Sequence, residues 1–148
     1  MAKAVACMQL NCHHSTSATA NLVNELLEST HIACIQEPHL VKGKPAGLGS
    51  QLQYYSKGEN PRAVVMASKN INFWPAPQFS SRDMATSIIK QDKLFYIASV
   101  YLDITQQDEH FFPSELSSLI EHCKQTNTML ILALDSNCLL YTSDAADE

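Results

Sequence analysis

The apolar positions in the first part of the chain predict a strand, a helix and a second strand. Residues 4–11, AVACMQLN, form a short apolar run typical of a buried strand, and Ile32 to Gln36 form another, which Pro38 ends. Between these runs, after Ser and Thr residues at 15–17 that could cap a helix, apolar residues recur at helical spacing: Leu22, Val23, Leu26 and Leu27. The three elements together have the length of a βαβ unit.

The middle of the chain is typical of strands separated by turns. Residues 39–50 are rich in Gly and Pro and predict a loop, whereas QLQYYS at 51–56 and RAVVMAS at 62–68 predict strands. The segment NFWPAPQFSSRD at 72–83 predicts a surface connection broken by prolines. Residues 84–103 contain two β-rich runs joined by a short polar turn, which predicts a hairpin.

The last part of the chain predicts one more helix and one more strand. Residues 113–127 have the pattern of an amphipathic helix with one apolar face: Leu116, Leu119, Ile120 and Cys123. Met129 to Leu134 form a continuous apolar run, which predicts a strand buried on both faces. The order of elements predicts mixed sheets covered by helices, an α/β sandwich.

Length, composition and charge restrict the kinds of protein that fit this pattern. The chain has 148 residues, enough for one domain, and 45% of them are apolar, enough for a core. The net charge is -5, and three of the acidic residues lie at its end: Asp144, Asp147 and Glu148. A polybasic surface is therefore excluded, and binding to nucleic acid would need local Lys and Arg contacts or a metal ion.

The five cysteines do not form a disulfide framework or a zinc motif. Their spacing is irregular and most lie in apolar segments, which favours buried, reduced thiols in an intracellular protein. Cys12, His13 and His14 are neighbours, and adjacent residues of a strand point to opposite faces, which disfavours zinc binding. The N-terminus lacks the pattern of a signal peptide and no apolar run has the length of a membrane span, so we expect no membrane contact.

Polar side chains end four of the predicted strands. They are Gln9 with Asn11, Gln36 with Glu37, Tyr101 with Asp103, and Asp135 with Asn137. The strand ends of α/β folds gather functional sites, and carboxylates and carboxamides are oxygen ligands suited to Mg²⁺ and phosphate. Simpler interpretations remain open: Glu37 as a surface carboxylate, Tyr101 as a half-buried strand aromatic and Asn137 as a turn residue.

Five short motifs in this order resemble the endonuclease/exonuclease/phosphatase superfamily. They are QLN at 9–11, IQEP at 35–38, RAVV at 62–65, SVY at 99–101 and LALDSN at 132–137. The resemblance is greatest to the endonuclease domain that precedes the reverse transcriptase in non-LTR retrotransposons. It implies a DNase I-like fold, a four-layer α/β sandwich in which helices flank two mixed β-sheets.

The resemblance also implies a role for each strand-end residue. Glu37 would hold Mg²⁺ or Mn²⁺ with Asn11 beside it, and Asp135 would orient or deprotonate the attacking water. Asn137 would hold Asp135 and the phosphate, and Tyr101 would donate a hydrogen bond to the phosphate. Two arginines, Arg62 and Arg82, are candidates for phosphate contacts, with structural ion pairing as the alternative.

The implied function is a metal-dependent, DNA-nicking endonuclease with a reverse transcriptase domain downstream, nuclear in the intact element. One alternative is an exonuclease or phosphatase of the same superfamily, and another is an inactive α/β binding module. The late Asp-His pair of the superfamily is missing, and residues 138–148, CLLYTSDAADE, resemble a translated sequencing adapter. We therefore expect residues 1–137 to be the N-terminal part of a truncated domain, poorly stable and inactive by itself.

Overall fold

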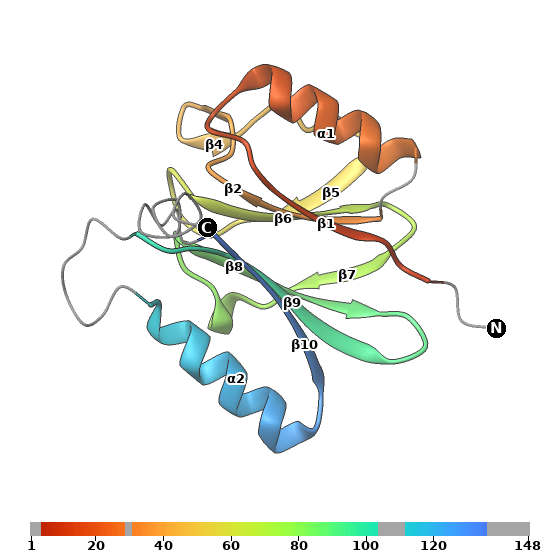
Figure 1. The fold of residues 1–148 in the computed structure, drawn as a ribbon, viewed down its shortest axis with the longest axis vertical. Coiled ribbons are helices and arrows are strands. Elements are labelled where there is room, and N and C mark those ends of the chain that lie inside the picture. The colour runs from red at the N-terminus through yellow and green to blue at the C-terminus, as the bar shows by residue number, and fades with distance from the viewer. Residues whose placement is uncertain (1–3, 29–30, 104–111, 136–148) are drawn as a thin grey trace, which may run out of the picture.

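A computed structural model describes residues 4–28, 31–103 and 112–135 of the chain. Within this part, helices and sheets form four layers, with α1 above two stacked sheets and α2 below them (Figure 1). This arrangement confirms the predicted α/β sandwich with two mixed sheets flanked by helices. No helix in the described residues is both long and apolar enough to span a membrane.

Each sheet combines one parallel strand pair with antiparallel neighbours. The first sheet has the order β1-β2-β6-β5: β1 (Cys7–Asn11), β2 (Ile32–Gln36), β6 (Ala63–Ser68) and β5 (Leu52–Tyr55). The second has the order β10-β9-β8-β7: β10 (Met129–Asp135), β9 (Leu94–Tyr101), β8 (Met84–Lys90) and β7 (Asn72–Pro75). Helix α1 (Thr16–Glu28) connects β1 to the parallel strand β2, and α2 (Ser114–Thr126) lies between the parallel strands β9 and β10.

Three apolar clusters fill the spaces between the four layers. Strand alternation produces them, because successive side chains of a strand point to opposite faces. Ile32 and Cys34 of β2 pack toward the second sheet with Ile97 of β9, whereas Ala33 and Ile35 pack toward α1. A third cluster joins the second sheet to α2 through buried side chains: Tyr96, Ala98, Val100, Leu116, Leu119 and Cys123.

Two smaller elements complete the described fold. The predicted loop at 39–50 contains a short hairpin, β3 (Leu40–Val41) with β4 (Lys44–Pro45), in which Lys42 and Gly43 both have positive φ. Two positive φ values in a two-residue turn match the twist of hairpin strands. The predicted cap of α1 is Ser15, whose hydroxyl accepts a hydrogen bond from the Ala18 backbone N–H.

Three sequence-based expectations about the fold are wrong. The segment predicted as a surface connection contains β7 and a 3₁₀ turn (Pro77–Phe79), because Pro75 at the strand end leaves the remaining pairing with β8 intact. β10 is not buried on both faces: within the described residues it pairs with β9 alone, and Met129 and Leu134 are exposed. Cys7 is an exposed thiol, because β1 is likewise at the sheet edge.

Candidate active site

The ends of two strands from different sheets meet at one hydrogen bond. The Asn11 carboxamide Nδ2 donates to the Asp135 carboxylate Oδ2 at 2.5 Å, across 124 residues of sequence. Asn11 ends β1 beside Gln36 of β2, and Asp135 ends β10 beside Tyr101 of β9. Both parallel strand pairs therefore end on the same side of the sandwich (Figure 1).

Glu37 follows β2 directly and lies beside the turn that follows β1. Its carboxylate is 3.4 Å from His13 Nδ1 and 4.0 Å from His14 Nε2, and its side chain is 20% exposed. The backbone N–H of His13 also donates to Asn11 Oδ1 at 2.8 Å. Through this turn, Glu37 and Asn11 are held next to each other.

The backbone around Glu37 is held in an uncommon conformation. His13, His14 and Glu37 all have φ between 48° and 59°, in the left-handed region that non-glycine residues rarely adopt. The His14 N–H donates to the Glu37 carbonyl at 2.9 Å, and the Glu37 N–H donates to the Arg62 carbonyl at 3.0 Å. Such strain persists where surrounding contacts fix it, and it is concentrated at functional sites.

Tyr101 lies between the charged groups of the site. Burial raises the pKa of its phenol, and the negative charge of Glu37 raises it further. Asp103 and Asp135 act on the pKa in the same direction, whereas the positive charge of Arg62 lowers it. Tyr101 is therefore a protonated hydrogen-bond donor at neutral pH.

Arg62 is engaged in ion pairs with two carboxylates. Its Nε and Nη2 donate to the two oxygens of Asp83 at 2.6 Å, and Nη1 donates to Asp103 at 3.0 Å. The guanidinium carbon is also 4.7 Å from the centre of the Tyr101 ring. These contacts raise the pKa of Arg62 and favour the structural role that the sequence left open.

The predicted residue Arg82 is not linked to the other site residues by a side-chain hydrogen bond or ion pair within the described part of the chain. The Arg82 side chain is exposed, and its Nε donates to the Asn60 carbonyl at 2.9 Å. Asn137 lies outside the described residues. The roles of Asn11, Glu37, Tyr101 and Asp135 in catalysis or metal binding stay predictions, although the fold brings these four residues together.

The donor atoms at this site fit a hard divalent cation. Two carboxylates, Glu37 and Asp135, and the carboxamide oxygen of Asn11 come from three strand ends. No group of three or more His, Cys, Asp and Glu side chains with metal-binding geometry occurs in the described part of the chain. Mg²⁺ does not require one, because it is bound by one or two carboxylates, with water and substrate phosphate completing its shell.

Sequence reasoning missed two features of the site. Asp83 pairs with Arg62 across 21 residues, and no local sequence pattern predicts that contact. The approach of His13 and His14 to Glu37 depends on left-handed turns that the residue types disfavour. By contrast, the sequence already indicates that Gln36 is a polar residue at a strand end beside Glu37.

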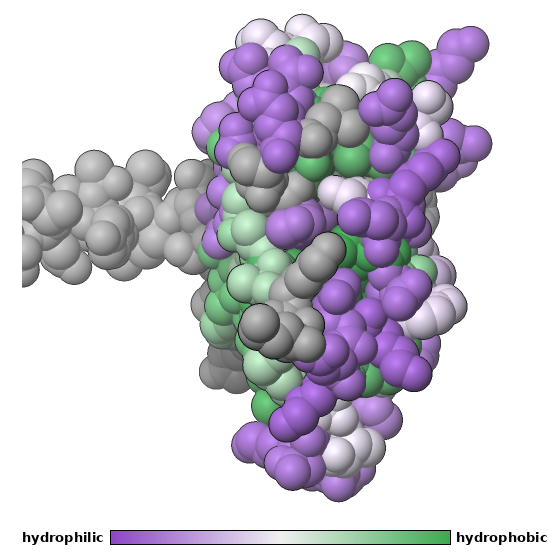
Figure 2. Space-filling view, turned by 90° about the vertical axis from the view of Figure 1, so that its right-hand side faces the viewer, coloured by the Kyte–Doolittle hydropathy of each residue, from purple (hydrophilic) through white to green (hydrophobic). Residues whose placement is uncertain are grey.

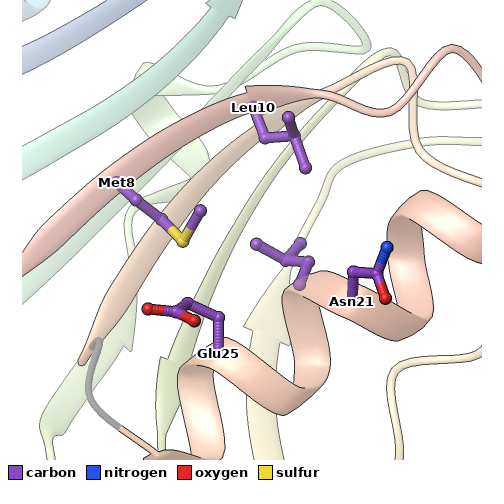
Figure 3. Close-up of a pocket in the computed structure, with 5 residues that line it drawn as sticks. Met8, Leu10, Asn21 and Glu25 are labelled. Atoms are coloured by element: carbon purple, nitrogen blue, oxygen red, sulfur yellow. The ribbon is translucent and has the colours of Figure 1, made fainter.

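A hollow on the other face of β1 is separate from this site. It has a volume of about 370 Å³ and is lined by Met8 and Leu10 of β1 and by Asn21, Leu22 and Glu25 of α1. Figure 3 shows the strand and helix side chains pointing toward the same space. Met8 and Leu10 alternate with Gln9 and Asn11, so β1 presents apolar residues to α1 and polar residues to the second sheet.

Comparisons with known proteins identify the fold. No protein-family model matches the chain, and no curated protein matches it in sequence. Its structure is similar to the endonuclease domain of TRAS1, a telomere-specific non-LTR retrotransposon, with a TM-score of 0.66, 16% identity and coverage of 91% of this chain. A humanised D. rerio TDP2 with 14 mutations is also similar, with a TM-score of 0.60, 16% identity and coverage of 90% of this chain.

The chain matches only part of each of these structures. It spans 60% of the TRAS1 domain and 63% of the TDP2 chain. At this level of identity the likeness concerns the architecture, which agrees with the five sequence motifs and their places on the strands. The described part of the chain therefore has a DNase I-like fold, as predicted, over the portion of these two structures that it spans.

Proposed function

We propose that the chain is part of a metal-dependent phosphodiesterase domain that nicks DNA for a retrotransposon polyprotein. At the coarser level, the structural neighbours support a nuclease or phosphodiesterase superfamily. The observation that carries the finer proposal is the contact between Asn11 and Asp135, with Glu37 and Tyr101 beside it. Four strand ends supply a metal-binding carboxylate, a second carboxylate, a carboxamide and a phenol, which are part of the set of groups that hydrolysis of a phosphodiester uses.

Each group has a chemical task in this proposal. Glu37 and Asn11 would hold Mg²⁺ or Mn²⁺, and the bound ion would neutralise charge that develops on the phosphoryl oxygens. Asp135 accepts a hydrogen bond from Asn11 and orients the attacking water or takes its proton. Tyr101 donates its phenolic hydrogen to a phosphate oxygen, since its raised pKa keeps the proton in place.

The ion pairs of Arg62 give it a supporting task. Its guanidinium is shared between Asp83 and Asp103 and lies against the Tyr101 ring, so it fixes the position of that ring. We propose that direct contacts to DNA phosphate come instead from exposed side chains at the rim, with Arg82 as one candidate. We also propose that a reverse transcriptase domain lies downstream in the same polyprotein.

Nicking of supercoiled plasmid tests the proposed activity. The chain is joined to the sequence that follows residue 137 in the parental DNA, and conversion to open circles is measured over an Mg²⁺ titration. Glu37→Gln should lower the rate at least about 100-fold, because it removes a carboxylate from the metal and leaves the shape unchanged. Glu25→Gln on α1 is the matched control and should nick at the unaltered rate.

Two results would redirect the proposal. Equal nicking by the Glu37→Gln and unaltered proteins would show that Glu37 does not hold the metal. Absence of nicking with efficient release of single nucleotides or inorganic phosphate would favour the exonuclease or phosphatase alternative.

A further inference from the structure

A fully buried glutamine lies directly beneath the candidate site. The side chain of Gln36 is 0% exposed and occupies the last position of β2, before Glu37. Its Nε2 donates to Ser99 Oγ at 2.9 Å and to the Ala133 carbonyl at 3.4 Å. A glutamine of the first sheet is thus bonded to two strands of the second sheet, β9 and β10.

A second glutamine extends this connection to β1. Gln9 Nε2 donates to Gln36 Oε1 at 3.3 Å and to the Leu134 carbonyl at 2.9 Å. Ser99 Oγ in turn donates to the Ile35 carbonyl at 2.7 Å. The three polar side chains therefore join the four strands that carry the site, β1, β2, β9 and β10.

These polar residues lie in a layer immediately behind the site residues. Gln9 is two residues before Asn11, Ser99 is two before Tyr101, and Ala133 is two before Asp135. Residues two apart in a strand point to the same face, so each site residue continues the row that the polar layer begins. If one sheet were displaced along the other by one residue, Asn11 would no longer reach Asp135. The same displacement would break the hydrogen bonds of the polar layer.

We propose that the amide bridge formed by Gln9 and Gln36 is the positioning element of the site. It holds the first sheet against the second in the one register that lets Asn11 reach Asp135. The amides touch neither metal nor substrate in this proposal, and they act through the placement of the strand ends. The predicted loss of metal binding rests on the proposed function. The predicted placement of Asn11 against Asp135 rests on the hydrogen bonds alone.

The test uses the whole 148-residue chain and two independent readouts. The first is the ¹⁵N–¹H signal pair of the Asn11 carboxamide, identified by its loss in Asn11→Asp, which reports the bond to Asp135. The second is the affinity for Mn²⁺ measured by electron paramagnetic resonance. Gln36→Met keeps the length of the side chain and removes its hydrogen bonds, and Gln9→Met does the same at an exposed position that tolerates change.

Gln53→Met is the matched control. Gln53 Nε2 also donates to two backbone carbonyls, those of Ser68 at 2.9 Å and Ile71 at 2.8 Å, but these lie within the first sheet and the turn that follows it. Loss of the Gln53 bonds should lower the thermal midpoint as loss of the Gln36 bonds does. It should leave the Asn11 signals and the Mn²⁺ affinity unchanged, because no contact to the second sheet is removed.

The proposal predicts that Gln36→Met and Gln9→Met each move the Asn11 carboxamide signals toward those of a free carboxamide. It also predicts Mn²⁺ binding about 10-fold weaker in Gln36→Met, the lower end of the effect of removing a partner of a metal ligand, because Gln36 acts through the strand ends and not on a ligand. If Gln36→Met does not fold, Gln9→Met alone decides, and unmoved Asn11 signals there overturn the bridge. Equal changes of the Asn11 signals or of the Mn²⁺ affinity in Gln53→Met overturn it as well.

The two readouts separate this inference from the proposed function. If the unaltered chain binds no Mn²⁺ but the Asn11 signals move in both bridge variants, the positioning role holds and the metal assignment fails. If Mn²⁺ binds the unaltered chain and both bridge variants equally and the Asn11 signals stay in place, the positioning role is overturned and the metal assignment holds.

Discussion

The contact region between β1 and β10 has different side-chain chemistry at its two ends. At the end where both strands stop, Gln9, Asn11 and Asp135 join the sheets by hydrogen bonds. At the other end is an open hollow of about 380 Å³, which is lined by apolar side chains, among them Val5, Met129 and Ile131, and at one side by the polar turn 91–93. The same two strands thus have one end with fixed polar contacts and one end with loose apolar contacts.

This difference separates stability from geometry. Apolar burial stabilises a fold roughly in proportion to area and has no preferred direction. Hydrogen bonds add less net free energy, but they require particular distances and angles. The apolar end can therefore contribute to folding without an exact arrangement, whereas the polar end fixes the relative positions of the site residues.

The open apolar side is also visible on the surface. Figure 2 shows hydrophobic residues along its left edge, the side that faces the viewer in Figure 1, where β1 and β10 lie in front of the other strands. Met129 is 58% exposed and Leu134 is 41% exposed on β10. Exposed apolar area of this kind favours association, so the expected poor solubility of the chain remains a testable prediction.

The largest expected loss of stability comes from the apolar space between the sheets. Ile97→Ala removes a fully buried side chain of β9 and should lower the free energy of unfolding by about 3 kcal/mol, since a cavity is left. Chemical denaturation measures this change. Leu94→Ala, on the same strand but 44% exposed, should cost much less, and equal costs would contradict the central place of this cluster.

The second prediction concerns the ion pairs at the polar end. Arg62→Met leaves Asp83 and Asp103 without their shared cation and should cost about 2 kcal/mol, between the values for exposed and buried pairs. Chemical denaturation of the variant should show a cost that shrinks with added salt. Arg82→Met, which loses one exposed bond to the Asn60 carbonyl, should be nearly neutral. A comparable loss in both variants would refute the structural role of Arg62.

Two buried serines sharpen the comparison further. Ser99 belongs to the polar layer and has partners, whereas Ser87 Oγ on β8 is buried without a hydrogen-bond partner among the described residues. Ser99→Ala should cost about 1–2 kcal/mol, because Gln36 and Ile35 each lose a partner. Ser87→Ala should be neutral or stabilising by up to about 1 kcal/mol in the same denaturation measurement. Equal destabilisation by both would show that the two sites do not differ.

Much of this contrast could be predicted from the sequence. The alternation of Gln9 and Asn11 with Met8 and Leu10 already indicates a strand with one polar face at its end. The same holds for Ser99 and Tyr101 on β9. Residue type and period therefore indicate which strand ends carry polar side chains, whereas the roles of these residues come from the family resemblance and stay predictions.

Other features depend on neighbours that no local pattern specifies. The apolar run of β10 predicts burial, but exposure depends on whether another strand lies beside it. The pairing of Arg62 with Asp83 joins the start of β6 to the turn before β8. The left-handed conformation of Glu37 is fixed by contacts to His14 and Arg62 and is disfavoured by the residue itself.

A smaller effect is expected from pH. In the folded protein the pKa of Tyr101 is raised above its ordinary value of 10, so folding disfavours the phenolate. The related stability is fully present below pH 10 and is lost as the pH rises through the folded-state pKa. Tyr101→Phe should therefore lose less stability than the unaltered chain between neutral pH and pH 11, as measured by urea unfolding. An identical pH dependence would contradict the placement of this half-buried phenol among the charges of the site.

The smallest effect is expected at the apolar end. Cys7 lines the hollow there and is exposed, whereas Cys12, Cys34 and Cys123 are buried. In a Cys138→Ser background, a maleimide should label Cys7 first and change the free energy of unfolding by less than about 0.5 kcal/mol. Mass spectrometry of digests identifies the labelled thiol. Labelling that displaces the Asn11 carboxamide signals would contradict the independence of the two ends.

Paramagnetic broadening by Mn²⁺ tests most directly whether the strand ends form one cation site. Substoichiometric Mn²⁺ added to the ¹⁵N-labelled chain should broaden the signals of Asn11, Glu37, Tyr101 and Asp135 together, and Glu37→Gln should abolish the effect. Signals at the apolar end, such as those of Cys7 and Met129, should stay sharp. Broadening in separate regions, or broadening that persists unchanged in Glu37→Gln, would contradict a shared site at the ends of β1, β2, β9 and β10.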